Sequence, residues 1–321
     1  MKLQKFILGR GIQLFVTLLI VLTMLFLVFR AMPGDAADMV INPQMDAKAK
    51  ENLRHLYGLD KPMHEQYILY MKNMLTFKFG TSFRTMNPVW MEVQPRIGPT
   101  FLLFGTSLVL NYITGILLGM GMAWYRGTKF EIGGIVGSLI FRSMPYFWLG
   151  LLMLFVFSAR LDIFPTGGFK TAGVDMVWYK RAGDILYHMT LPLITLIIVG
   201  IGGIALLMRN SMLDTLGEDY IVTARAKGLS ERNIMIHHAA RNAMLPIMTS
   251  IALSVALIFA GGIITEQVFS WPGLGRLLIT RTLAHDYPVV QGVFYIIALL
   301  VLTMNAVADV LYAFLDPRVQ L

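Results

Sequence analysis

Six long apolar segments alternate with polar intervals along the chain. They lie at about residues 11–30, 100–124, 134–158, 189–208, 247–268 and 289–314. Each has about 20 residues or slightly more, the length that an α-helix needs to cross roughly 30 Å of hydrocarbon. The pattern therefore predicts an all-α integral membrane protein with six transmembrane helices.

The polar interval between the first and second segments is long enough to form an insert with helices of its own. Residues 46–56 are expected to form a helix capped by Asp46, and residues 63–75 a second helix after Lys61-Pro62. We expect residues 1–93 to comprise the first transmembrane helix and this insert. Residues 94–321 are expected to form a domain of five transmembrane helices.

The polar stretch from Glu218 to Pro246, between the fourth and fifth apolar segments, has the pattern of two short helices separated by a break. Acidic residues begin the first helix and basic residues end it, as the helix dipole favours. Gly228 is placed to adopt a positive φ and end that helix. Ser230 follows as the N-cap of a second helix that continues into the fifth segment. We expect the whole loop to span about residues 209–246, and a plain solvated loop is the alternative.

Composition supports a membrane protein and weakens other classes. Hydrophobic residues make up 56% of the chain and charged residues 14%, with a mean hydropathy of +0.64. The formal net charge of +8 is spread over loops and forms no patch for nucleic acid. Lys and Arg flank the first segment and follow the second and fourth, so with six spans both termini are expected to be cytoplasmic.

Motifs for catalysis or nucleotide binding are missing from the sequence. There is no GxxxxGK[ST] loop and no HExxH pair, and the chain has no cysteine. His237 and His238 are adjacent, so on a helix they point about 100° apart and make a poor pair of metal ligands. The sequence therefore predicts no enzyme activity, no catalytic or metal site and no bound cofactor.

A few residues within the apolar segments, and one in the last loop, are candidates for a transport pathway or gate. Ionisable residues are costly in hydrocarbon and usually face protein or a water-filled path. Arg142 lies in the third segment just before Met144-Pro145, where proline bends a helix and frees a carbonyl. Glu266 lies near the end of the fifth segment, and Trp271 lies in the next loop and suits a lipid–water interface. For Arg142, a packing ion pair or snorkelling to the interface is the alternative.

Short motifs across the chain resemble the dipeptide/oligopeptide family of ABC importer permeases. They are Met32-Pro33-Gly34-Asp35, Tyr57-Gly58-Leu59-Asp60-Lys61-Pro62, Phe79-Gly80-Thr81-Ser82, Asp219-Tyr220-Ile221, Thr223-Ala224-Arg225-Ala226-Lys227-Gly228-Leu229, Arg241-Asn242-Ala243, Leu245-Pro246, Phe269-Ser270-Trp271-Pro272-Gly273-Leu274-Gly275, Asp286-Tyr287-Pro288-Val289-Val290-Gln291-Gly292 and Asp316-Pro317-Arg318. The wider Glu-Ala-Ala pattern of such loops is not kept, because Val222 and Thr223 stand in its first two positions. This departure is typical of the peptide-permease branch.

The resemblance implies a subunit of an ATP-driven, binding-protein-dependent importer in the inner membrane. It implies a second related permease, two ATPase subunits that bind the ATP and Mg²⁺, and an extracytoplasmic substrate-binding protein. The insert after the first helix is then extracytoplasmic. The stretch after the fourth helix is then a coupling helix that docks on the ATPase. The positions so implied are Glu218, Asp219, Tyr220, Thr223, Ala224, Arg225, Ala226, Lys227, Gly228 and Leu229.

Short peptides are the expected cargo, and relatives of this kind also carry nickel chelates, glutathione or oligosaccharides. An ion-driven secondary transporter is the alternative from another class. It would require paired acidic residues within the spans, and the sequence offers almost none.

Overall fold

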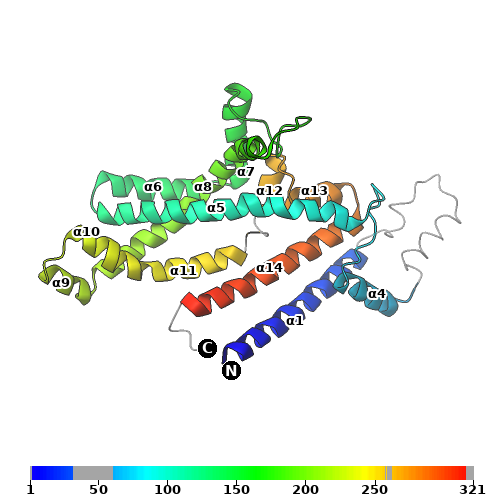
Figure 1. Ribbon diagram of the computed structural model, residues 1–321, viewed down its shortest axis with the longest axis horizontal. Coiled ribbons are helices and arrows are strands. Elements are labelled where there is room, and N and C mark those ends of the chain that lie inside the picture. Colours follow the sequence, from blue (N-terminus) through cyan, green and yellow to red (C-terminus); the bar gives the residue numbers. More distant parts are fainter. Residues whose placement is uncertain (1, 32–60, 257, 259–261, 316–321) are drawn as a thin grey trace.

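A computed structural model of the chain describes residues 2–31, 61–256, 258 and 262–315. Within these residues the protein is built from helices, with one isolated β-bridge between Thr81 and Pro88 (Figure 1). The expected helix at 46–56 lies outside the described residues. The helices are α1 (Lys2–Ala31), α4 (Met63–Leu75), α5 (Val89–Trp124), α6 (Lys129–Ser143), α7 (Tyr146–Met153), the π-helix η1 (Leu154–Arg160), α8 (Trp178–Leu216), α9 (Asp219–Ala226), α10 (Glu231–Asn233), the π-helix η2 (Ile234–Ala239), α11 (Ala240–Ala256), α12 (Ile263–Val268), α13 (Leu274–Leu283) and α14 (Tyr287–Leu315).

Four of these helices are long and apolar enough to cross a membrane. They are α1, α5, α8 and α14. Helices α5 and α8 have 36 and 39 residues, so each is about 55 Å long and extends beyond the hydrocarbon. The expected boundary between residues 93 and 94 falls inside α5. The expected helix at 63–75 is confirmed as α4.

The third apolar segment is broken at Pro145, where the sequence predicted a bend. Helix α6 ends at Ser143, and α7 with η1 continues at 98° to it. Pro145 stands between the two helices in an extended conformation, and the proline ring and missing N–H explain why α6 cannot continue. This segment is therefore a broken span or a re-entrant structure.

The fifth apolar segment is also interrupted. Helix α11 covers its first part to Ala256, and α12 begins at Ile263 as a separate short helix. With α6 and α7 counted as one bent pair, the described residues contain up to five spans, and six are not established.

Glycine permits α8 to pack closely against α5 and α6. A Cβ at Gly119 of α5 would lie 2.5 Å from the carbonyl oxygen of Ala205 in α8, and one at Gly115 would lie 2.7 Å from Ile204 Cβ. A Cβ at Gly202 of α8 would clash with the Ser138 carbonyl of α6. At these positions small residues let the helix backbones approach closely.

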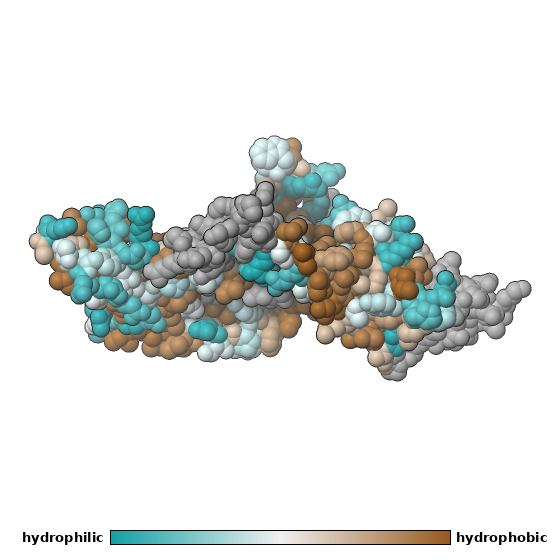
Figure 2. All heavy atoms as spheres, turned by 90° about the horizontal axis from the view of Figure 1, so that it is seen from below, coloured by the Kyte–Doolittle hydropathy of each residue, from teal (hydrophilic) through white to brown (hydrophobic). Residues whose placement is uncertain are grey.

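The longest helices run roughly along the long axis, and polar elements lie at the ends (Figure 1). Helices α9 and α10 form one end, while α4 and α13 lie toward the other. Helix α1 packs along α14, where Arg10 and Asp309 form an ion pair of 3.1 Å. Figure 2 shows hydrophilic side chains gathered at the end with α9 and α10, and apolar side chains over much of the middle. Phe15 and Ile20 of α1 are about half exposed, as expected for side chains that face lipid.

Replacing Gly119 by leucine is expected to lower the thermal unfolding midpoint in mild detergent. The side chain would force α5 and α8 apart, and overpacking of this kind costs about 1–3 kcal/mol. Gly98 is the control on the same helix, since nothing lies within 4 Å of its Cβ position. Gly98→Leu should leave the midpoint near that of the wild type. Equal midpoints for the two variants would contradict the packing role of Gly119.

Candidate functional site

A short polar helix, α9, is held between the ends of two membrane helices. Helix α8 ends at Leu216, and α9 begins at Asp219 after the extended residue Glu218. Gly228 has a φ of +77°, as the break in the sequence pattern predicted. Ser230 caps the following helix, because its hydroxyl accepts a hydrogen bond from the Asn233 amide at 3.4 Å. From there α10, η2 and α11 follow without an intervening loop.

One face of α9 is fixed to the end of the helix bundle. Ile221 is fully buried and Ala224 nearly so, in a cluster that includes Met212 of α8 and Ile234 of η2. Asn242 donates a hydrogen bond of 2.6 Å to the hydroxyl of Tyr220. These contacts join α9 to both α8 and α11, so the three helices are expected to move together.

The rest of α9 is exposed. Val222 is 60% exposed, and Tyr220, at the edge of the fixed face, is 38% exposed. Arg225 forms two hydrogen bonds to the carboxylate of Glu231, at 2.9 and 3.3 Å, and this contact raises the pKa of Arg225 above its usual value. The exposed side of α9 therefore combines the apolar side chain of Val222 with acidic and basic side chains, among them Asp219 and Arg225.

Of the ten expected coupling residues, Ala224 is buried, Leu229 is partly buried and the other eight are exposed. Ile221 was not expected as a contact residue, yet it shares the buried face with Ala224. The exposed members are Glu218, Asp219, Tyr220, Thr223, Arg225, Ala226, Lys227 and Gly228. Leu229 is partly buried and packs against the cluster under α9.

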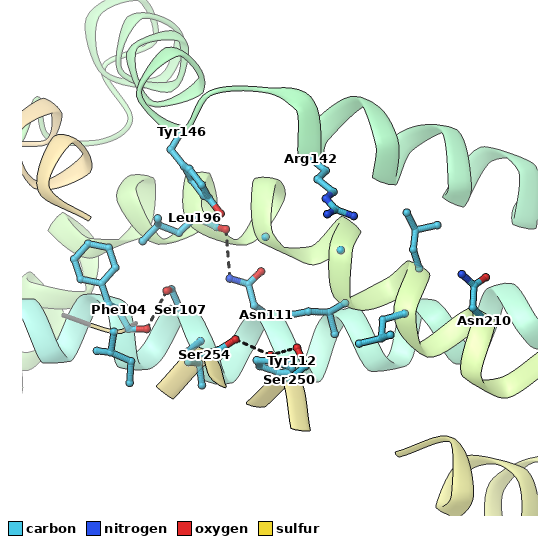
Figure 3. A pocket seen from close by; sticks show the side chains of 17 residues that line it. Phe104, Ser107, Asn111, Tyr112, Arg142, Tyr146, Leu196, Asn210, Ser250 and Ser254 are labelled. Atoms are coloured by element: carbon cyan, nitrogen blue, oxygen red, sulfur yellow. Dashed lines mark hydrogen bonds between the residues drawn. The ribbon is translucent and has the colours of Figure 1, made fainter. Parts of the chain in front are cut away.

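A cavity of about 860 Å³ lies in the membrane part of the chain, against α5 and α8 and between α6 and α11 (Figure 3). Apolar side chains, glycines and uncharged polar groups form most of its lining. Arg142 is the one charged residue among those that line it. Gly200 and Gly203 of α8 also line the cavity.

Arg142 and Tyr146 lie on the two sides of the break between α6 and α7, and both point toward α5 and α8 (Figure 3). Met144 and Pro145 form the break itself and are not among the lining residues. Asn111 of α5 donates a hydrogen bond of 3.3 Å to the Leu196 carbonyl of α8. The structure therefore places Arg142 at the cavity. Met144 and Pro145 lie outside the lining and determine the direction in which α7 leaves α6.

A cluster of three hydroxyl groups forms the wall of the cavity beside α11. The Tyr112 hydroxyl lies 2.7 Å from Ser250 Oγ and 2.8 Å from Ser254 Oγ. Sequence reasoning missed these residues, because isolated serines and tyrosines in apolar segments carry no motif. Their shared position follows only from the packing of α5 against α11.

Glu266 of α12 and Trp271 of the following loop are not among the residues that line this cavity, and both contact the early part of α5. The Glu266 carboxylate is buried and accepts hydrogen bonds from the Thr100 hydroxyl at 2.7 Å and the Arg276 amide at 3.0 Å. A Cβ at Gly273 would clash with this carboxylate, so the glycine is required here. Glu266 thereby satisfies free amides at the start of α13.

Trp271 does not lie at a lipid–water interface, as its residue type and loop position had suggested. Its side chain is fully buried and donates a hydrogen bond of 2.9 Å to the Pro99 carbonyl. The Phe169 ring packs edge-on against it at 5.0 Å between centroids. Tertiary packing and a carbonyl partner outweigh the interfacial preference of tryptophan.

The motif at residues 79–82 and the motif at residues 286–292, about 200 positions apart in the sequence, meet at a second buried carboxylate. Asp286 is fully buried and accepts hydrogen bonds from Ser82 Oγ at 2.5 Å and from the Phe83 amide at 2.9 Å. Arg281 lies 3.7 Å from the same carboxylate and 2.7 Å from that of Glu92. Both motifs were visible in the sequence, but their contact was not.

Two family models match most of the chain. Residues 115–321 match the binding-protein-dependent transport system inner membrane component, and residues 3–104 match the N-terminal part of such membrane components.

Curated relatives cover nearly the whole chain. The oligopeptide transport system permease protein AppB of Bacillus subtilis is 34% identical over 99% of this chain and all of its own. The di/tripeptide transport system permease protein DppB of Pseudomonas aeruginosa is 36% identical over 92% of each chain. The glutathione transport system permease protein GsiC of Salmonella choleraesuis is 36% identical over 98% of this chain and 99% of its own.

Replacing Glu266 by alanine is expected to loosen the loop that joins α12 to α13. The Thr100 hydroxyl and the Arg276 amide would lose a buried acceptor, which costs about 1–3 kcal/mol. Hydrogen exchange of the backbone amides in residues 266–280 should become faster. Glu218→Ala is the control, because Glu218 is exposed and its side chain caps no helix. Unchanged exchange in residues 266–280 of Glu266→Ala would contradict this role of the carboxylate.

Proposed function

Because the chain belongs to the family of binding-protein-dependent transport system inner membrane components, we propose that it is a permease subunit of an ATP-driven importer for short peptides. The relatives named above are permease components of oligopeptide, di/tripeptide and glutathione transport systems. Peptides are our choice of cargo, since two of these three relatives carry peptide transport in their names. Glutathione, a nickel chelate or an oligosaccharide would fit the same architecture.

The structural observation that supports this function is helix α9. An ATP-driven permease without a nucleotide site of its own needs a surface through which an ATPase moves it. Helix α9 has a buried face that joins it to α8 and η2, and an exposed face with Val222 and Arg225. We propose that the exposed face docks on an ATPase subunit as a coupling helix.

The proposed mechanism is alternating access. When ATP closes the two ATPase subunits, α9 moves as a rigid unit, because Ile221 is packed into the cluster of α8 and η2. Helix α8 continues directly toward the membrane cavity, so displacement of its end changes the opening of that cavity. ATP hydrolysis then resets the assembly. The chain itself supplies the pathway and binds neither ATP nor Mg²⁺.

The proposed assembly contains this chain, a second related permease, two ATPase subunits and an extracytoplasmic substrate-binding protein. We propose six spans with both termini cytoplasmic. Residues 1–93 then form the first span with an extracytoplasmic insert, and residues 94–321 form the transport domain. The insert and the last loop, which Asp286 joins through Ser82, would lie on the side of the binding protein.

Uptake by proteoliposomes tests this function. The chain is reconstituted with its second permease and ATPases, and labelled tripeptide is supplied with the binding protein outside. We expect uptake that requires ATP, the binding protein and this chain. Uptake that an ion gradient drives without any ATPase would instead support a secondary transporter.

Replacing Val222 by glutamate is expected to weaken attachment of the ATPase. The substitution replaces an exposed apolar side chain of α9 by a charge and leaves its buried face unchanged. Loss of an anchor at such a contact costs about 2 kcal/mol or more, so recovery of ATPase with the tagged permease should fall severalfold. ATP-driven uptake should fall with it.

Leu283→Glu is the matched control. Leu283 is 76% exposed and lies on α13, toward the other end of the molecule (Figure 1). It should leave ATPase recovery unchanged. If Val222→Glu retains the ATPase as well as Leu283→Glu does, α9 is not the docking surface.

A further inference from the structure

The membrane cavity contains one unpaired cation. Arg142 lines it, and no carboxylate is found among the other lining residues. Within the described part of the chain, Arg142 has no hydrogen bond or ion pair. Its side chain is exposed on this chain, so a group from outside can reach it, and a cation in a membrane segment usually faces such a partner or a water-filled path. The missing counter-charge points to an anionic group that enters the cavity from outside the chain.

The cavity also provides neutral hydrogen-bonding groups. The hydroxyls of Tyr112, Ser250 and Ser254 form a cluster on the side of α11, and Tyr146 lines the cavity on the other side of the helix break from Arg142. Hydroxyl groups both donate and accept hydrogen bonds, so they suit a peptide backbone of any sequence. The volume of about 860 Å³ is within the range of small-molecule sites, roughly 300–1,000 Å³.

We infer that this cavity binds the C-terminal carboxylate of a peptide in transit, with Arg142 as the cation that pairs with it. The assignment rests on the proposed function, because the ligand class is taken from the proposed cargo. Guanidinium binds carboxylate through two parallel hydrogen bonds, and charge-assisted bonds of this kind are among the strongest available to a protein. Every unmodified linear peptide carries this group, so one arginine serves cargo of varied side chains.

The position of Arg142 adds a mechanical consequence. Arg142 lies in the last turn of α6 and Tyr146 in the first turn of α7. A carboxylate that contacts both side chains connects the two halves of the bent pair across Met144-Pro145. A peptide bound in the cavity therefore favours one angle between α6 and α7. When the peptide leaves, the angle between the two helices can change.

Photolabelling of the purified importer complex tests the assignment. The probes are a benzophenone-bearing tripeptide with a free carboxylate and the same tripeptide as its C-terminal amide. Binding protein is left out, so that its own preference does not contribute. For the wild type we expect the acid to label the cavity helices about tenfold more than the amide, the effect of one charge-assisted contact.

Variants at position 142 test whether Arg142 causes the preference for the acid probe over the amide probe. Arg142→Gln should abolish the preference for the acid, and Arg142→Lys should retain most of it. Lys129→Gln is the control, because it removes a cation from the same helix outside the cavity. The inference is overturned if Arg142→Gln keeps the preference, or if the wild type labels equally with both probes. Loss of the second permease from the Arg142→Gln complex would also overturn it, because Arg142 would then pair across the subunit interface.

ATP-driven uptake by the same wild-type preparation separates this inference from the proposed function. Acid-selective labelling without ATP-driven uptake would retain the carboxylate site and reject the importer mechanism. Uptake without acid-selective labelling would reject the carboxylate site alone.

Discussion

The close approach of α5 and α8 at glycine positions is the constraint on which the rest of the structure depends. Gly115 and Gly119 let the two backbones meet, since a Cβ at Gly119 would be 2.5 Å from a carbonyl oxygen of α8. The same helix pair forms one wall of the cavity, and α8 carries α9 at its end. A rigid α5–α8 pair therefore joins the membrane cavity to the polar surface where an ATPase is proposed to act.

Two buried carboxylates organise the opposite end of the molecule. Glu266 satisfies amides at the start of α13, and Asp286 holds Ser82 and the Phe83 amide. Each carboxylate has several donors, which is the condition under which burial of a charge is tolerated. These contacts fix the loops around the start of α5, and the break at Pro145 directs α7 toward the same loops.

The sequence predicted correctly those features that depend on residues close to one another along the chain. Gly228 at positive φ and Ser230 as a cap were predicted from residue type and position, and so was α4 after Lys61-Pro62. Length and hydropathy indicated the long membrane helices. Pro145 indicated a bend after Ser143, but no local signal indicated its size of 98°.

Features that depend on tertiary packing were not predictable in the same way. Trp271 is buried because the Pro99 carbonyl and the Phe169 ring surround it, and neither is near it in sequence. The hydroxyl cluster around Tyr112 likewise requires α11 to pack on α5. The coupling role of α9 and the gate role of Arg142 stay predictions.

Site-specific cross-linking from α9 tests the central claim most directly. The chain has no cysteine, so Val222→Cys introduces a single thiol to which a photoactivatable cross-linker can be attached. In the purified complex, the account predicts a cross-link from position 222 to an ATPase subunit and none from a thiol at Leu283→Cys. A position-222 thiol that stays unlinked to the ATPase while transport proceeds would contradict the account.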